Sequence, residues 1–402
     1  MKGYGSGPRQ WAVKKVLGAD GRYWPYLLHN GIPQPLPTLW VKTVCGADAV
    51  NTADSYLRDV QVLYEIADSL GVIVEERLRS LNGFRDGELR SIASRLGRTA
   101  SGSQASKSTC SRRSETLKSF LKFAFDFYKQ FANLSLIEQA QVDRNSLRQC
   151  KIVERQLRIA ASAGEGPNRA TSLTPEDVAV IDRVIHPDSI MNPFRSREVR
   201  FRNYCLLHVM LATGLRRGEA VLLELSDVDL GATPTIRIRR PTSVARRKRR
   251  DGASMKTLGR QVPISLPLAD VLEQYRDIWR LESVTASAPS PAFFLSTRDG
   301  RRLSAYTINR IIDQIGRVPE VAVLGKRLHP HGMRSTAVNS IRRKIVEMDS
   351  SNSLVLTDAL AYVGGWSQRS PMVGHYTRAA ISERLSSVLR EESGDEADEH
   401  GQ

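Results

Sequence analysis

Cysteine is scarce in this sequence, with four residues in 402. They are widely separated, at Cys45, Cys110, Cys150 and Cys205, and none belongs to a Cys-x-x-Cys pair or a Cys/His cluster. This spacing argues against both a zinc site and a disulfide framework. Of the seven histidines, only His329 and His331 lie close together. We therefore expect no structural metal.

Long hydrophobic runs are also missing. No apolar stretch approaches the ~20 residues that a membrane-spanning helix needs. The N-terminus, MKGYGSGPRQWAVKKV, lacks the apolar core of a secretory signal peptide. We expect a protein of the cytoplasm, associated there with the DNA of the cell. A chain of 402 residues with 41% hydrophobic residues is expected to form two or three packed domains.

Acidic residues are in deficit, with 43 Asp and Glu against 59 Lys and Arg and a net charge of +16. The last twelve residues, EESGDEADEHGQ, carry six acids and no Lys or Arg, so residues 1–390 carry +22. A positive field of this size favours a polyanionic partner. The alternative is a charge that serves solubility or a ribosome-associated role.

The N-terminal part is expected to be mainly helical. Residues 1–37 contain turn-like stretches and predict a small hairpin or an extended arm. A helical domain is expected over 38–162, with helices at 51–71, 87–97 and 115–134 and a charged helical continuation to about 162. Asn51 or Thr52 is the expected cap of the first helix. The Ser-rich segment 98–114 predicts a flexible loop.

Residues 163–172 have the small, polar composition of a linker. A second domain is expected over 173–390, followed by an acidic, disordered tail over 391–402. Thr174 and Pro175 are typical of the cap and the first position of a helix. The expected elements are helices at 174–185, 198–213 and 217–223, strands at 235–240 and 260–265, and mostly helix thereafter, interrupted at 292–296. The fold class is mainly α with one small antiparallel β-sheet.

The first candidate segment is LATGLRRGEAVLLELSDVDL, residues 211–230. One helix is expected to end at Gly214 and another to begin, with Arg216 in the turn. Such a turn presents a guanidinium and backbone N–H groups to an anion. Glu219 lies three residues on and can hold Arg216 in place. The alternative is an ordinary surface arginine at a helix start.

The second candidate segment is LHPHGMRSTAVNSIRRK, residues 328–344. The spacing of His331 and Arg334 places both side chains on one face of a helix that starts after Pro330. An imidazole beside a guanidinium suits a phosphate better than a metal ion. His329 precedes the proline, so we expect it to point elsewhere. The alternative for His331 is a core histidine.

The turn between the two expected strands is strongly basic. Its basic residues are Arg246, Arg247, Lys248, Arg249, Arg250, Lys256 and Arg260. A basic hairpin suits the phosphate backbone of DNA. The alternative is a solvated loop.

The last candidate segment is VGGWSQRSPMVGHYTRAA, residues 363–380, in which Tyr376 follows Trp366 by ten residues. A tyrosine this close to the C-terminus usually packs in the core. Because the segments above occur in the same chain, Tyr376 is alternatively a nucleophile. Tyr362 is the nearest alternative nucleophile, and we expect it to pack in the core.

The order and local context of these segments resemble the tyrosine recombinase, or phage integrase, family. ATGLRRGEAVLLELSDVD resembles its first-arginine motif, KTLGRQVPI its lysine hairpin, PHGMRSTAVN its His-x-x-Arg helix and GGWSQRSPMVGHYTR its tyrosine segment. The sequence departs from the family pattern in four places: a tryptophan-to-tyrosine interval one residue longer, an enlarged hairpin, Trp366 in place of a histidine, and Ser335 after the second arginine.

The resemblance implies a site-specific recombinase with a two-domain, C-shaped DNA clamp and no cofactor. Tyr376 is the implied nucleophile, Arg216 and Arg334 bind the scissile phosphate, His331 assists proton transfer, and Trp366 positions the phosphate. Glu219 orients Arg216. Lys256 is the implied general acid, with Lys248 as competitor. The five residues Arg246 to Arg250 and Arg260 are expected to contact DNA.

The implied partners are double-stranded DNA with specific recombination sites and three further copies of the chain. The apolar spacing after Tyr376 predicts an amphipathic helix at about 380–389. That helix is expected to dock on a neighbouring subunit or, alternatively, to pack on its own domain. The competing functions are a type IB topoisomerase and a DNA-binding relative without catalysis, such as a repressor.

Overall fold

The computed structural model describes residues 11–46, 49–99, 101–162, 172–239, 258–283, 290–348, 353–374 and 376. These residues fall into two compact units. The described residues up to Ser162 form the first unit, and those from Ser172 onward form the second. Each unit has its own hydrophobic core. Within the described ranges, every helix is too short or too polar to span a lipid bilayer.

The first unit begins with a three-stranded antiparallel sheet of β1 (Trp11–Leu17), β2 (Tyr23–His29) and β3 (Ile32–Pro33). The expected hairpin is therefore present. Trp11 pairs with His29, and Leu17 pairs with Tyr23. Gly21 takes the positive φ of 68° in the turn that joins β1 to β2. Apolar side chains of β1 and β2 enter the core beneath the sheet.

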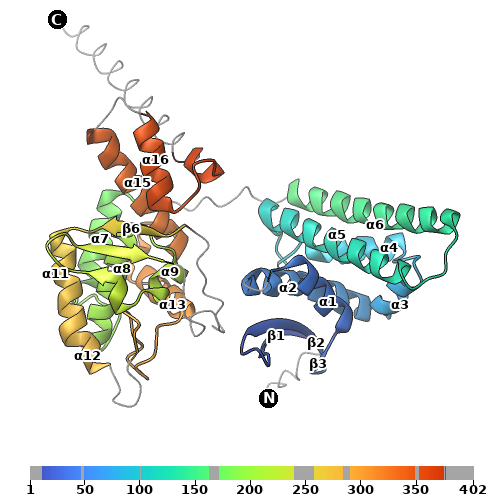
Figure 1. The fold of residues 1–402 in the computed structure, drawn as a ribbon, viewed down its shortest axis with the longest axis horizontal. Coiled ribbons are helices and arrows are strands. Elements are labelled where there is room, and N and C mark those ends of the chain that lie inside the picture. Colours follow the sequence, from blue (N-terminus) through green and yellow to red (C-terminus); the bar gives the residue numbers. More distant parts are fainter. Residues whose placement is uncertain are drawn as a thin grey trace, which may run out of the picture. The chain divides into compact units, whose positions relative to one another are not determined.

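Helices make up the rest of the first unit. They are α1 (Pro35–Val44), α2 (Val50–Ser69), α3 (Val74–Arg79), α4 (Asp86–Leu96), α5 (Lys107–Lys129) and α6 (Leu136–Ser162). Figure 1 shows α5 and α6 running side by side along this unit. Trp40 is fully buried and donates its indole N–H to Ser119 at 3.2 Å, which fixes α1 to α5.

Two expectations for the first unit were wrong. Neither Asn51 nor Thr52 caps α2, because the helix begins at Val50 and Ala49 is its N-cap. The Ser-rich segment is helical from Lys107, since the Ser106 hydroxyl accepts the backbone N–H of Thr109 at 3.3 Å. Serine favours loops through bonds of this kind, and here such a bond starts a helix.

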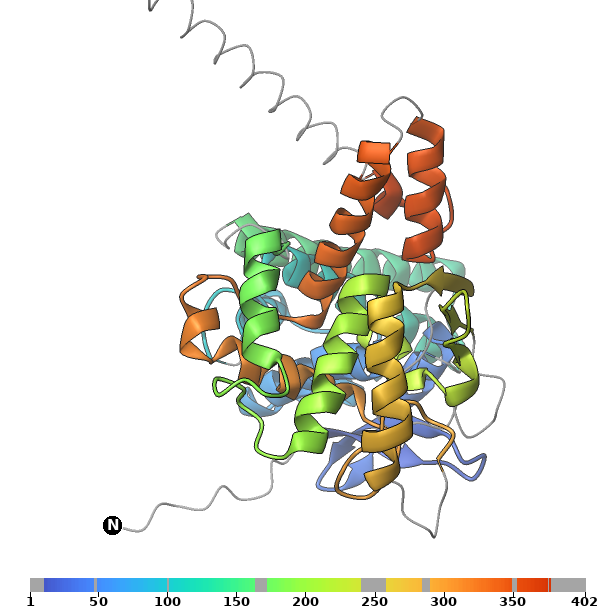
Figure 2. The same cartoon turned by 90° about the vertical axis from the view of Figure 1, so that its left-hand side faces the viewer.

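The second unit contains a mainly helical framework, as the sequence predicts. Its helices are α7 (Pro175–Ile185), α8 (Arg197–Thr213), α9 (Arg217–Leu222), α11 (Leu266–Gln274), α12 (Arg280–Glu282), α13 (Ala305–Gly316), α14 (Pro319–Ala322), α15 (Pro330–Met348) and α16 (Ser353–Gly364), with a short 3-10 helix η1 (Leu225–Asp227) and a π-helical segment η2 (Tyr275–Trp279) that joins α11 to α12. In Figure 2, α8 lies between α7 and α11, and α15 lies beside α16. Thr174 caps α7 as predicted, accepting the N–H of Asp177 at 3.2 Å.

One small antiparallel sheet accompanies these helices, in the order β4 (Val228–Asp229), β5 (Thr235–Ile238) and β6 (Arg260–Pro263). The two longer strands are those the sequence predicts. Thr235 pairs with Pro263, and Ile238 pairs with Arg260. The sheet therefore places Arg260 at the start of β6, opposite the end of β5. Because β6 is the last strand in the order, one of its edges has no strand partner in the part of the chain that the structure describes.

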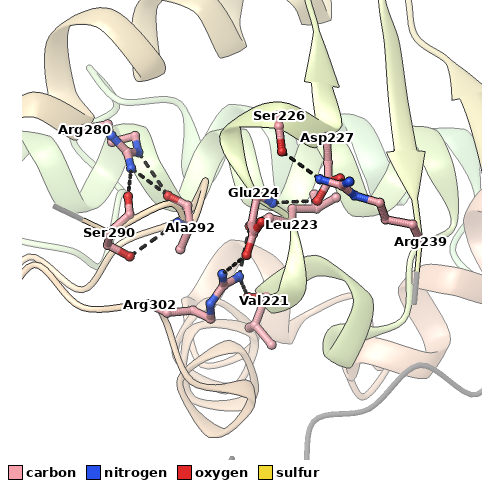
Figure 3. A network of polar contacts seen from close by, with 10 residues as sticks. All are labelled: Val221, Leu223, Glu224, Ser226, Asp227, Arg239, Arg280, Ser290, Ala292 and Arg302. Atoms are coloured by element: carbon pink, nitrogen blue, oxygen red, sulfur yellow. Dashed lines mark hydrogen bonds and ion pairs between the residues drawn. The ribbon is translucent and has the colours of Figure 1, made fainter. Parts of the chain in front are cut away.

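Partly buried arginines fasten the loops around this sheet (Figure 3). Arg302 donates to the Val221 carbonyl at 2.9 Å and to the Glu224 carboxylate at 2.9 Å. Arg239, the last described residue before the basic turn, binds the Asp227 carboxylate and the Ser226 hydroxyl. The Ser-Asp pair of the first motif therefore holds the outgoing end of β5.

Candidate active site

Arg216 stands at the junction between α8 and α9. Gly214 ends α8 in the left-handed conformation, with φ of 63°, and donates its N–H to Met210 at 3.1 Å. A Cβ at Gly214 would make only ordinary contact with α15, at 3.6 Å from Ala337. Glycine is therefore favoured here by the left-handed backbone of the turn. Arg216 follows as the N-cap of α9.

Glu219 lies behind Arg216 with 1% of its side chain exposed. Its carboxylate accepts the backbone N–H of Arg216 at 3.0 Å and the Arg216 Nη1 at 3.4 Å. This is the arrangement expected from the three-residue spacing. The same carboxylate accepts Nη2 of Arg260 at 3.0 Å and lies 4.0 Å from Nη1 of Arg334. One buried carboxylate thus faces three guanidinium groups.

Arg334 projects from α15 and is almost completely buried, with 1% exposed. Its Nη1 donates to the carbonyl of Gly214, and its Nη2 donates to the carbonyl of Gly364 at 2.6 Å. Burial and the neighbouring Arg216 lower the pKa of Arg334 to about 10. The group remains a cation at neutral pH, held by carbonyls from two turns.

A cavity of about 280 Å³ opens in front of these arginines. It is lined by Arg216, Arg217, His329, Pro330, His331 and Arg334. The expectation that His329 points elsewhere was wrong. Its Nδ1 accepts the backbone N–H of Gly332 at 3.0 Å, because a ring before Pro330 can reach back over the first turn of α15 and cap it.

Five of the six residues that line the cavity are arginines or histidines. The rings of His329 and His331 stack with centroids 6.4 Å apart. Burial, His329 and the two arginines lower the pKa of His331 below its ordinary value of 6.5. Burial likewise lowers the pKa of Arg216. A cavity with this lining repels cations and suits a tetrahedral anion such as a phosphodiester.

Trp366 and Tyr376 form a stack beside Arg334. Their rings lie 5.4 Å apart with 17° between their planes, and the Arg334 guanidinium lies 5.1 Å from the Trp366 ring. Tyr376 is 3% exposed and packs against Val338 and Leu360, and its hydroxyl donates to Ser335 at 3.3 Å. The tyrosine is therefore a packing residue in this conformation, held against the helix that carries Arg334.

The indole N–H of Trp366 is buried and has no hydrogen-bond partner among the described residues. Buried N–H groups are rarely left unpaired, so this donor suggests a site for an acceptor from outside the protein. Only an acceptor can be served, since an indole has no lone pair to offer.

Tyr362 does not pack in the core, contrary to expectation. Its side chain is 52% exposed, and its hydroxyl donates to the Gln261 carbonyl at 2.8 Å and accepts the Gln261 N–H at 3.1 Å. The hydroxyl thus satisfies the backbone of β6 at its open edge. Nearby, the Leu258 N–H donates to the Gly365 carbonyl at 3.1 Å. Both contacts fasten β6 to α16 and the turn after it.

Arg260 does not present its guanidinium on the surface, as a DNA contact would require. Its side chain is 1% exposed and is paired with Glu219. The alternation of β6 turns Arg260 inward, and no pattern in the sequence of the basic turn distinguishes it from the other basic residues there. The other basic residues of the turn, Arg246 to Arg250 and Lys256, lie outside the described residues. The segment 377–402, with the expected helix and acidic tail, also lies outside them.

Comparison with known proteins matches residues 186–383 to the phage integrase family. The Tn1549 transposon integrase in complex with transposon right end DNA has a similar fold, with 19% identity over 88% of this chain and 100% of that chain and a TM-score of 0.54. A second structure of that integrase, with a circular intermediate DNA, matches at 16% identity over 87% and 99%, with a TM-score of 0.51.

The XerH site-specific recombinase bound to palindromic difH substrate matches at 13% identity over 87% of this chain and 93% of that chain, with a TM-score of 0.42. The comparison with curated proteins finds no match. The two Tn1549 structures support the fold described above, a mainly helical chain with a small antiparallel sheet.

The lowered pKa of His331 predicts how stability depends on pH. The unfolded chain takes up a proton near pH 6.5, whereas burial and nearby cations resist that proton in the fold. Acid therefore favours unfolding, and stability should fall as the pH drops from about 7.5 to about 5.5. His331→Asn should lose less stability over that range in urea unfolding. An unchanged pH dependence in this variant would show that His331 protonates equally well in both states.

Proposed function

Residues 186–383 are a phage integrase family domain, so the chain is a tyrosine recombinase that cleaves and rejoins DNA, and on that premise we propose which residues carry the reaction. Tyr376 is the nucleophile, and Arg216, Arg334 and His331 bind the scissile phosphate in the cavity they line. The observation that carries this assignment is the convergence of both arginines and the histidine on one cavity, with the tyrosine stacked on Trp366, whose ring faces Arg334.

The reaction exchanges one phosphodiester for another. The Tyr376 oxygen attacks the phosphorus and loses its proton, and the bond from phosphorus to the 5′ oxygen breaks. The products are a 3′-phosphotyrosine and a free 5′-hydroxyl, which takes up a proton. Attack by a second 5′-hydroxyl reverses these steps and restores the tyrosine. The bond count is unchanged throughout, so the step is balanced without a nucleotide cofactor.

The two arginines stabilise the negative charge that develops on the phosphate during the reaction. Each guanidinium can donate two parallel hydrogen bonds to non-bridging oxygens, which a lysine ammonium does poorly. Both groups are fixed before DNA arrives, Arg216 by Glu219 and Arg334 by two carbonyls. Donors held in this way stabilise the developing charge without reorganising during the reaction.

His331 and Trp366 complete the phosphate site. The lowered pKa of His331, caused first by burial, keeps its ring neutral at pH 7, so it can relay a proton near Tyr376. The buried indole N–H of Trp366 is a donor for a phosphate oxygen. Lys256 is proposed as the general acid for the 5′ oxygen, with Lys248 as the alternative.

Cleavage requires that Tyr376 leave its present position. Its hydroxyl is bound to Ser335, and its ring does not line the cavity. We propose that DNA binding releases this hydroxyl, which then turns past Trp366 toward the phosphate. The contact with Ser335 therefore holds the nucleophile away from the phosphate site until DNA is present.

DNA is the partner of the chain. We propose that the chain acts at specific DNA sites and that its two units form a C-shaped clamp around each site. We also propose that four copies assemble on two such sites. The amphipathic spacing after Tyr376 supports docking of that segment on a neighbouring copy. The match of residues 186–383 to the integrase family favours recombination over the topoisomerase and repressor alternatives.

Replacing Tyr376 by Phe removes only the proposed nucleophilic oxygen. We expect Tyr376→Phe to bind DNA nearly normally and to form no covalent complex on a suicide substrate nicked near the cleavage point. The products are separated on a denaturing gel. Tyr362→Phe is the matched control and should still form the complex. A shifted band from the Tyr376 variant would assign the attack to another residue.

Arg216→Ala and Arg334→Ala should each slow cleavage by about 10²–10³, the usual cost of one preorganised donor. DNA affinity should change little, and its salt slope by about one unit. Arg317→Ala is the control, because that side chain is 76% exposed and is paired with Asp313 on the surface. Equal losses of affinity and rate would show that the two arginines are ordinary backbone contacts.

The general acid can be identified with a substrate that has sulfur in place of the 5′ bridging oxygen. A thiolate leaves without a proton, because thiols have a pKa of about 8.5. Lys256→Ala should slow cleavage of ordinary DNA by roughly 10²–10⁴ and cleave the sulfur substrate nearly as fast as the unaltered protein. Lys248→Ala should show neither effect. The reverse pattern would assign the role to Lys248.

Deletion of residues 379–402 tests the proposed assembly. The shortened chain should still bind one site and cleave it slowly, but should form no complex of two sites and no recombinants. Deletion of 391–402 alone is the control and should do little. Recombination at the normal rate after the longer deletion would rule out docking between copies. Insolubility of the shortened chain would instead indicate that the segment packs on its own domain.

A further inference from the structure

We propose that Arg260 is a positioning residue for DNA cleavage, which acts by occupying the Glu219 carboxylate so that Arg216 and Arg334 stay directed at the phosphate. This inference rests on the proposed function of the cavity. It differs from the role that the basic turn suggests for Arg260, which is a direct contact to DNA.

Burial separates Arg260 from DNA and joins it to Glu219. The two side chains are each 1% exposed, and Nη2 of Arg260 lies 3.0 Å from Oε2 of Glu219. Arg260 is not among the residues that line the cavity, whereas Arg216 and Arg334 are. Any effect of Arg260 on the phosphate must therefore pass through Glu219 or through the electrostatic field of the cluster.

Glu219 has two further guanidiniums within reach. Nη1 of Arg216 lies 3.4 Å from Oε1, and Nη1 of Arg334 lies 4.0 Å from Oε2, the oxygen that Arg260 occupies. A buried carboxylate that loses one partner strengthens its pull on the others, since an unpaired buried charge is costly. Without Arg260, Oε2 would draw Arg334 backward, away from the cavity.

The net charge of the three arginines and Glu219 supports the same inference. Three guanidiniums and one carboxylate leave two net positive charges behind the cavity. Both Arg216 and Arg334 are close enough to Arg260 for it to lower the pKa of each, after burial as the first cause. Removing Arg260 halves the net charge that faces a phosphodiester in a poorly screened position.

The backbone that carries Arg260 is well fixed. Arg260 pairs with Ile238 across the sheet, and the next residue, Gln261, is held on both its N–H and its C=O by Tyr362. Two residues earlier, the Leu258 N–H is bound to Gly365. A side chain on such a strand can hold Glu219 in one geometry, which positioning requires.

The test is a double-mutant cycle on Glu219 and Arg260 with a nicked suicide substrate. Arg260→Gln should slow cleavage by about 10–100-fold, less than the loss of a direct phosphate donor. Its affinity for DNA should stay within about twofold, with an unchanged salt slope, because no phosphate contact is lost. In the Glu219→Gln background, the same Arg260→Gln change should slow cleavage by less than about threefold.

A second substrate separates positioning from a merely structural role. A methyl group in place of one non-bridging oxygen removes the negative charge of the scissile phosphate. The defect of Arg260→Gln should shrink at least about fivefold on this substrate, because less positive charge is needed. A loosened fold would slow both substrates equally.

Three results would overturn the inference. The first is an equal loss of cleavage rate on Arg260→Gln in the unaltered protein and in the Glu219→Gln background. That result would show that Arg260 acts independently of Glu219. The second is a loss of DNA affinity with a salt slope reduced by about one, which would make it a DNA contact. The third is a defect unchanged on the methyl-substituted phosphate.

If the single variant does not fold, the comparison of the double variant with Glu219→Gln remains decisive, since both lack the carboxylate through which Arg260 is proposed to act. A difference of more than about tenfold between them would then contradict the proposal. Failure of the proposed function would be recognised by a different result, a covalent complex between DNA and the Tyr376→Phe variant. That result does not depend on Arg260.

Discussion

One buried carboxylate organises the site. Glu219 faces Arg216, Arg260 and Arg334, which come from the start of α9, the start of β6 and the first turns of α15. Three cations brought this close would repel one another in a poorly screened interior, and the carboxylate offsets one of their charges. The site therefore keeps a net positive charge for an anion while its elements remain packed together.

Arg334 connects this cluster of charges to the proposed nucleophile. Its guanidinium is bound to the carbonyls of Gly214 and Gly364 and faces the ring of Trp366, against which Tyr376 stacks. The proposed phosphate-binding group and the proposed nucleophile are thus linked through Trp366. In this conformation Tyr376 is bound to Ser335 and lies outside the lining of the cavity.

The sheet adds the second support. Asp227 and Ser226 hold Arg239 at the end of β5, and Tyr362 holds Gln261 at the open edge of β6. Both strands that flank the basic turn are therefore fastened at their ends. A long basic segment can then be presented to DNA from a rigid base, whatever conformation the segment itself takes.

The sequence by itself determined the local elements and the local pairs. The helices α7 to α9, the strands β5 and β6 and the bond between Arg216 and Glu219 follow from patterns only a few residues long. The positions of Arg260, His329 and Tyr362 were decided by tertiary structure. Arg260 meets a carboxylate forty-one residues away, Tyr362 meets a strand edge about one hundred residues away, and His329 turns onto its own helix. Side-chain direction depends on the partner that packing supplies, and no short stretch of sequence contains that partner.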